Sequence, residues 1–374
     1  MDSYSSDYGT EYSMAKPSRE LLWLWLIPLT ALLMYRWWGP ALPLSPRGEN
    51  VPQISYTWML RHLWASGDAL RGWNPLLLAG EPTATARIYH LHLGLAGISL
   101  LTGLSPEWLF KLSQWLSSFL GALGMYAYLR QRKRPPQASL VGGAIFALFP
   151  PRIALTVESL YVSILWSGLP WALWAYERTR LRPPLCIRPA VIWGLFLCWI
   201  ALTGPQWFLL FLPILVAYIV LRELGDWWGS KPPRPGLWTT LKRVLLTCAI
   251  GALVLTGLCL FYYLPTILEI KLLWAVRYNQ PFPGVSRWSV PWKLLGYLLK
   301  QRWLPGFSPL GWEAVRLFPD ISWYLGIIPS ILVLLGLLRF HRWKQDLPLS
   351  GTLLITLLLL AGASIPHNPI YALV

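Results

Sequence analysis

Charged residues are scarce in this sequence. Asp, Glu, Lys and Arg together make up 13% of the 374 residues, whereas hydrophobic residues make up 55%. A soluble domain usually carries about 25% charged residues, so the composition excludes an ordinary soluble protein. It is typical of a chain surrounded by lipid. The sequence therefore predicts an all-α, multi-pass bundle of about nine transmembrane helices, at about twenty residues each.

Acidic residues are scarcer than basic ones, with 16 Asp and Glu against 32 Lys and Arg and a formal net charge of +16. Such an excess can indicate nucleic-acid binding. Here, however, the basic residues form short clusters between apolar runs, as the positive-inside rule expects of cytoplasmic loops. The charge pattern therefore favours a membrane protein and excludes nucleic acid as a partner.

Cysteine is also rare, with four residues in the whole chain. Cys186 lies beside a basic loop, while Cys198, Cys248 and Cys259 lie inside apolar runs. The sequence has no CxxC spacing and no cysteine pair on the predicted outer side. It therefore predicts neither a disulfide framework nor a zinc site.

The first residues lack the basic n-region of a secretory signal, and they are polar and partly acidic. We interpret residues 1–19 as a cytoplasmic tail and residues 20–374 as one transmembrane bundle in the cell (inner) membrane. The chain stops just after a span that is predicted to run outward. Either its C-terminus is external, or the sequence is a truncated portion of a longer protein.

The apolar runs and the basic clusters between them predict one topology. Lys16 and Arg19 precede the first run, 20–38, which orients its N-terminus toward the cytoplasm. Two long segments, 39–106 and 269–321, then lie outside. Most of the 25 tryptophans lie at predicted span ends, as expected of an interfacial belt. The later spans are predicted at 107–129, 137–150, 160–176, 189–203, 206–221, 244–267, 322–338 and 350–363.

The first outer loop, 39–106, contains two helical patterns that do not predict spans. Apolar residues at roughly helical spacing between 54 and 65 indicate an amphipathic helix in the membrane interface. The run 91–105 is too short to cross comfortably and is closed by Pro106, so we interpret it as a juxtamembrane or re-entrant helix. If it crossed the membrane, the basic cluster at 130–134 would lie outside.

Polar chemistry is concentrated in this same loop. It holds Glu49, Asp68 and Glu81, together with Arg61 and Arg87 and three of the five histidines. In so apolar a chain, charged residues gathered in one loop are candidates for function. The alternative is a solvated loop between two helices.

The loop and the helices that follow it also carry residue patterns of a known family. They are Gly48-Glu49, Gly67-Asp68, the phrase Trp73-Asn74-Pro75 with Gly80-Glu81-Pro82, Lys111 in a helix ending at Tyr128-Leu129-Arg130, and Gly142-Gly143-Ala144 with Phe149-Pro150. With these residues, roughly positions 20 to 180 resemble the C superfamily of membrane glycosyltransferases (GT-C), and more narrowly the bacterial YfhO-type membrane proteins. The remaining chain is similar only in its pattern of spans. One departure is Glu49, where the family usually has Asp.

The resemblance implies a GT-C-like bundle that transfers a sugar from a polyprenyl-phosphate donor at the outer face of the membrane. Glu49 would then deprotonate or orient the acceptor hydroxyl, and Asp68 is the other catalytic candidate. Phosphate and lipid would be bound by Arg61, Arg87 and Arg152, each of which is otherwise a headgroup anchor. Trp73, Asn74 and Glu81 would belong to the substrate loop.

A metal is not assigned from the sequence. His90 and His92 could form a ligand pair for a metal or a pigment, but no third ligand stands at a recognisable spacing. Some enzymes of the resembled family use a second acid with a divalent metal, and Glu158 would be that acid. The other interpretation is a pair of interfacial histidines.

A second class of function is open to the same sequence. A non-enzymatic membrane subunit, either a scaffold or a lipid- or pigment-binding accessory of a larger complex, could carry a degenerate version of the fold. Its partners would be other membrane subunits. The partners of the enzyme would be membrane lipid and a polyprenyl-phosphate-linked sugar.

Overall fold

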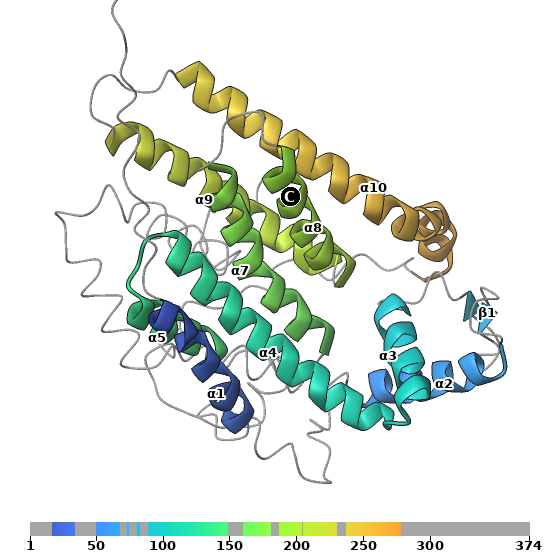
Figure 1. Cartoon of the computed structure of the whole chain (residues 1–374). Coiled ribbons are helices and arrows are strands. Elements are labelled where there is room, and N and C mark those ends of the chain that lie inside the picture. The colour runs from blue at the N-terminus through green and yellow to red at the C-terminus, as the bar shows by residue number, and fades with distance from the viewer. Residues whose placement is uncertain are drawn as a thin grey trace, which may run out of the picture.

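The computed structural model describes residues 17–33, 50–67, 73–74, 81–82, 89–148, 160–180, 187–203, 205–229 and 237–277. Helices occupy nearly all of these residues and confirm the predicted all-α class (Figure 1). A two-residue antiparallel pair, β1 (Trp73–Asn74) and β2 (Glu81–Pro82), is the exception. The helices are η1 (Pro17–Trp25), α1 (Leu26–Leu33), α2 (Asn50–Ala65), α3 (Tyr89–Thr102), α4 (Pro106–Gln131), α5 (Pro136–Leu148), α7 (Leu160–Arg180), α8 (Ile187–Thr203), α9 (Pro205–Gly229) and α10 (Leu237–Arg277).

Every predicted span before residue 270 contains a helix. The largest difference is at α10, which begins at Leu237 rather than 244 and ends at Arg277 rather than 267. Its last turns therefore enter the predicted outer segment 269–321. The apolar pattern predicts only the apolar part of a helix. Polar residues such as Lys242 and Glu269 have high helix propensity, so the helix extends beyond that part at both ends. The predicted spans at 322–338 and 350–363 lie outside the described residues.

The predicted first span changes helix type along its length. Pro17–Trp25 is a 3-10 helix, and α1 continues it as an α-helix from Leu26. Pro28 lies in the first turn of α1, where proline is tolerated because the backbone N–H has no intrahelical partner there. The fully buried Leu26 packs with Ala122 and Tyr126 of α4 and Ala147 of α5.

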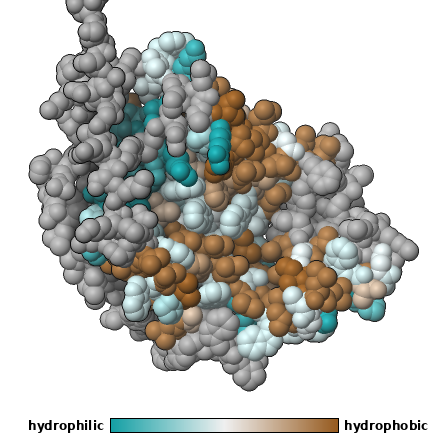
Figure 2. Space-filling model, viewed as in Figure 1, coloured by the Kyte–Doolittle hydropathy of each residue, from teal (hydrophilic) through white to brown (hydrophobic). Residues whose placement is uncertain are grey.

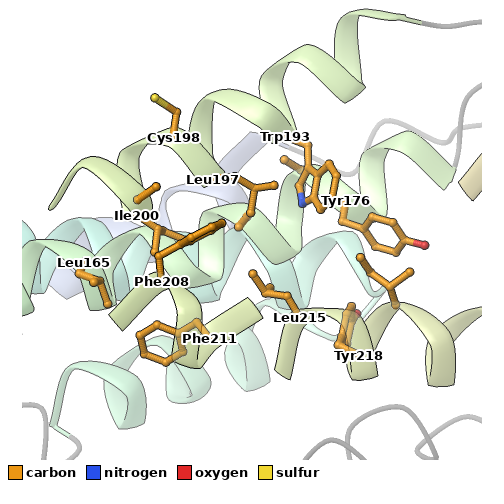
Figure 3. Packing of buried hydrophobic residues seen from close by; sticks show 14 of the residues in the cluster. Leu165, Tyr176, Trp193, Leu197, Cys198, Ile200, Phe208, Phe211, Leu215 and Tyr218 are labelled. Atoms are coloured by element: carbon orange, nitrogen blue, oxygen red, sulfur yellow. The ribbon is translucent and has the colours of Figure 1, made fainter. Parts of the chain in front are cut away.

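The largest core lies where α4, α7, α8, α9 and α10 meet (Figure 3). Aromatic pairs fill it, for example Trp166 against Phe211, with ring centroids 5.3 Å apart. Glycines permit close backbone approaches elsewhere in the bundle: a Cβ atom on Gly143 of α5 would lie 2.7 Å from the Ala122 carbonyl oxygen of α4. Small residues at helix contacts are common in membrane bundles.

A sharp elbow joins α3 to α4. The two helices are bent by 118°, and Gly103 between them has φ +72°, a left-handed conformation that favours glycine. Ser99 donates a hydrogen bond from its hydroxyl to the Leu104 carbonyl at 2.6 Å, which fixes the turn. Pro106 occupies the first turn of α4. The predicted short helix closed by Pro106 is thus confirmed, and its 14 residues span only about 21 Å.

Length and composition qualify one continuous helical segment among the described residues as a membrane span. It is Trp238–Leu260 of α10, and the bent pair Leu91–Thr102 and Pro106–Gln131 qualifies only if it is counted as one broken span. Most of the α10 segment is exposed; Leu253, for example, is 74% exposed. In the same view as Figure 1, Figure 2 shows apolar residues over much of the described surface, and hydrophilic residues gathered toward one end.

Candidate functional site

Helices α2 and α3 and the first two turns of α4 pack together at one end of the bundle, and we call them the α2–α3 assembly (Figure 1). Leu60 and Leu63 of α2 are buried against Ala96 of α3. The Trp64 indole N–H donates a hydrogen bond to the Leu93 carbonyl at 3.0 Å. The helix predicted between 54 and 65 is therefore present, and it is anchored on α3.

His92 lies inside this assembly and is 1% exposed. Its Nδ1 is 2.8 Å from the Thr57 hydroxyl, and that hydroxyl donates to the Gln53 carbonyl at 2.9 Å. The Tyr56 ring meets the imidazole edge-on at 5.5 Å. The hydrogen bond between His92 and Thr57 thus joins α3 to α2.

Of the candidate metal ligands His90, His92 and Glu158, the structure describes only the side chain of His92. No group of three or more His, Cys, Asp or Glu side chains in those ranges could hold a metal ion. His90 belongs to α3 two residues before His92, which is about 200° away around a helix. Its side chain, and the whole of Glu158, lie outside what the structure describes.

Arg61, a predicted phosphate ligand, lies on α2 above an aromatic ring. Its guanidinium carbon is 4.9 Å from the centroid of the Trp58 ring. The Trp58 indole N–H donates to Glu107 Oε1 of α4 at 2.6 Å. The Trp58 ring therefore lies between the Arg61 guanidinium that contacts it and the Glu107 carboxylate that it binds.

Lys111 and Glu107 are polar residues of this assembly that the sequence analysis did not select as site residues. Lys111 is 3% exposed, and its ammonium lies 4.8 Å from the Trp108 ring centroid. A buried lysine is uncommon, since desolvating the charge is costly unless it is compensated. The available signal was the spacing of four residues between Glu107 and Lys111 at the start of an apolar helix.

Trp73-Asn74 of the first phrase and Glu81-Pro82 of the second form the antiparallel pair β1–β2. Trp73 is opposite Pro82, and Asn74 is opposite Glu81. The structure thus brings together the two halves of the predicted substrate loop, between α2 and α3 in the chain. The remaining predicted site residues lie outside the described ranges: Glu49, which directly precedes α2, Asp68, Arg87 and Arg152.

The opposite end of α4 carries a network of ion pairs. It is centred on Glu177 of α7, whose carboxylate accepts hydrogen bonds from Tyr218 at 2.6 Å, Arg222 Nε at 2.9 Å and Arg180 at 3.1 Å. Arg132, which directly follows α4, lies 3.6 Å from the same carboxylate. Glu177 is only 5% exposed. One carboxylate therefore joins α4, α7 and α9.

Glu223 and Asp226 of α9 extend this ion-pair network. Glu223 accepts from the Tyr176 hydroxyl at 2.8 Å and from Arg180 Nε at 2.8 Å, and it also binds Arg243 of α10. Asp226 is more exposed and pairs with Arg180 and Arg222. The full network comprises Tyr128, Arg132, Tyr176, Glu177, Arg180, Tyr218, Arg222, Glu223, Asp226 and Arg243.

The arginines of the network lower the pKa values of two of its acids, Glu177 and Asp226. Burial opposes the charge on Glu177, but Arg180 and Arg222 outweigh this effect, so the pKa of Glu177 lies below its ordinary value. The same balance holds for Asp226, whose pKa is also lowered. Burial likewise opposes the charge on Arg180, yet Glu223 and Glu177 raise the pKa of its guanidinium.

The network was not predicted from the sequence, because its arginines were interpreted only as members of basic clusters in cytoplasmic loops. Arg180 follows Glu177 by three residues, and Asp226 follows Arg222 by four, so each pair lies on one face of its helix. That spacing was the available signal. The network joins the ends of α4, α7, α9 and α10, and we assign it a structural role rather than a reaction.

Comparisons of the chain with protein-family models, with curated proteins and with solved structures give no match.

Proposed function

We propose that this chain is an integral membrane glycosyltransferase that resembles the GT-C superfamily and transfers a sugar from a polyprenyl-phosphate donor at the outer membrane face. One observation carries the proposal: the polar loop of the sequence contains α2, β1–β2 and α3, and both helices pack against the start of α4. A loop that only connected two spans would need no such anchoring.

The distribution of charge along α4 supports the proposed orientation. Its 26 residues extend about 39 Å, somewhat more than a hydrocarbon core of about 30 Å. The α2–α3 assembly lies at its first residue, and the ion-pair network and the basic residues from Arg130 to Arg134 lie at its last. In the proposed nine-span bundle with a cytoplasmic N-terminus, the assembly is external and the network is internal.

In the proposed reaction, the Glu49 carboxylate accepts the proton of the acceptor hydroxyl as its oxygen attacks the anomeric carbon. The bond from that carbon to the phosphate oxygen breaks, and the polyprenyl phosphate leaves as an anion. Cations hold the departing charge, for which Arg61, Arg87 and Arg152 are the candidates. In the sequence, Glu49 directly precedes Asn50, the first residue of α2.

Labelling of introduced cysteines tests the orientation. In a chain whose own cysteines are replaced by serine, a membrane-impermeant maleimide added outside should modify Ser66→Cys and Ser286→Cys. It should spare Gln131→Cys, Ser230→Cys and Gln345→Cys until the membrane is opened with detergent. External modification of Gln131→Cys would reverse the orientation, because Gln131 is the last residue of α4 beside the basic cluster.

The function class is tested by what accompanies the purified protein. We expect organic extraction to release a polyprenyl phosphate, and membranes that contain the protein to transfer sugar from a lipid-linked donor. Mock-purified membranes from cells without the protein are the control. Stoichiometric partner subunits with no lipid-linked sugar and no transfer would instead establish the non-enzymatic scaffold.

A further inference from the structure

Helices α8 and α10 approach each other closely along their length (Figure 1). A Cβ atom on Gly194 of α8 would lie 3.0 Å from the Gly251 carbonyl oxygen of α10 and 3.1 Å from its Cα. Farther along the same contact, the Tyr263 hydroxyl donates to the Ala201 carbonyl at 2.5 Å. These contacts fix the two backbones on both sides of a short intervening stretch.

Two thiols face each other within that stretch. The sulfur atoms of Cys198 and Cys259 are 3.5 Å apart, and the side chains are 4% and 7% exposed. Both cysteines are free. Figure 3 shows Cys198 at the edge of the aromatic core formed with α7 and α9. Sequence spacing could not indicate this pair, because 61 residues separate its members.

We propose that Cys198 and Cys259 form an oxidisable dithiol that a two-electron thiol oxidant converts into a disulfide between α8 and α10. Each thiol loses one proton and one electron, the two sulfurs join, and the oxidant takes up two electrons and two protons. An azodicarboxamide becomes the hydrazine, and a small disulfide becomes two thiols. The sulfurs must close from 3.5 Å to about 2.05 Å, which rotations about both Cα–Cβ bonds can supply.

The position of the pair suits this chemistry. Cys198 precedes Thr203, the last residue of α8, by about 7 Å along the axis. Cys259 is next to Leu260, where the apolar segment of α10 ends. In the proposed orientation both helices run outward, so the pair lies near the outer face, where disulfides form and persist. The placement of the cysteine pair near the outer face rests on the proposed topology, whereas the pairing of the two cysteines does not.

The disulfide would act as a staple on α10. It would close a loop of 61 residues and restrict the unfolded chain, which raises the stability of the folded state. It would also tie α10, which leads into the predicted second outer segment, to the aromatic core around α8. Oxidation therefore strengthens a contact that exists in the reduced protein.

The test treats the purified full-length protein with diamide, a small neutral azodicarboxamide that enters apolar surroundings. Peptides are then mapped by mass spectrometry after the remaining thiols are alkylated in denaturant. We expect a Cys198–Cys259 cross-linked peptide, the loss of two hydrogen atoms and a rise of several degrees in the unfolding temperature. No cross-link, or a link through another cysteine, would overturn the proposal.

Variants of the thiols separate the staple from general oxidation. Cys248→Ser on the same helix is the matched control, since Cys248 is half-buried and lies about 16.5 Å before Cys259 along the axis of α10, and it should still show the cross-link and the stabilisation. Cys198→Ser and Cys259→Ser should lose both. If either serine variant fails to fold, the peptide map of the unmodified chain still decides the outcome.

Discussion

Glu49→Gln is expected to abolish sugar transfer while the protein stays folded. Amide and carboxylate are nearly isosteric, so the change removes a base and a charge but little packing. Loss of a general base lowers the rate by about 10² to 10⁴-fold. The measurement is transfer from a lipid-linked sugar by membranes that contain matched amounts of each variant.

Two neighbouring acids supply the controls for Glu49. Asp68→Asn and Glu81→Gln should cost much less. Asp68 follows Gly67, which has φ +77° in a turn that an acid can cap, and Glu81 lies in the β1–β2 pair directly before Pro82. Full activity of Glu49→Gln beside an inactive Asp68→Asn would move the base to Asp68. If the parent is also inactive, the scaffold function takes the lead.

Of the substitutions considered, Glu177→Gln is expected to lower the free energy of unfolding the most. The variant keeps the shape of the side chain but leaves Arg180, Arg222 and Arg132 without the carboxylate that they share. Breaking a buried ion pair costs about 3 to 5 kcal/mol. Because Arg180 and Arg222 keep their other partners, Glu223 and Asp226, we expect the low end of this range. Thermal unfolding in detergent should show a midpoint lower by about 10 °C.

Arg178→Gln is the matched control for this experiment. Arg178 is next in the chain but is exposed, and its guanidinium lies 4.8 Å from the Trp174 ring centroid. Its loss should cost less than about 1 kcal/mol. Equal unfolding temperatures for Glu177→Gln and the parent would show that the ion-pair network does not hold α4, α7 and α9 together.

The pH dependence gives a second readout of the same network. Because the pKa of Glu177 is lower in the folded protein than its unfolded value, its contribution to stability is fully present above about pH 4.3. It is lost as the pH falls through the folded pKa. The parent should therefore lose stability below about pH 4 more steeply than Glu177→Gln, which has no carboxylate to protonate.

The helices were predictable from the sequence because a long apolar run satisfies its backbone N–H and C=O groups within the segment when it forms a helix. The elbow was also predictable, since Pro106 follows a short apolar run. The ends of α10 were not, because its helical hydrogen bonding continues beyond the apolar segment.

The side-chain contacts were beyond a reading of the sequence alone. Nothing in the YHLHL run shows that His92 meets Thr57, 35 residues earlier, rather than a metal. Cys198 and Cys259 were placed correctly in apolar runs, but their pairing depends on which faces of α8 and α10 meet. A hydrophobic run predicts a helix in lipid, whereas its neighbours depend on side-chain packing across the whole bundle.

The residues of the ion-pair network are synthesised at different times, because they lie far apart in the sequence. Glu177 and Arg222 are 45 residues apart, and Glu223 and Arg243 are 20 apart. At about 5 to 20 residues per second, Arg222 leaves the ribosome about 2 to 9 s after Glu177. In that interval Arg132 and Arg180 are the network cations already synthesised. Arg222 of α9 and Arg243 of α10 become available only later, so the network is completed in the order in which its helices are synthesised.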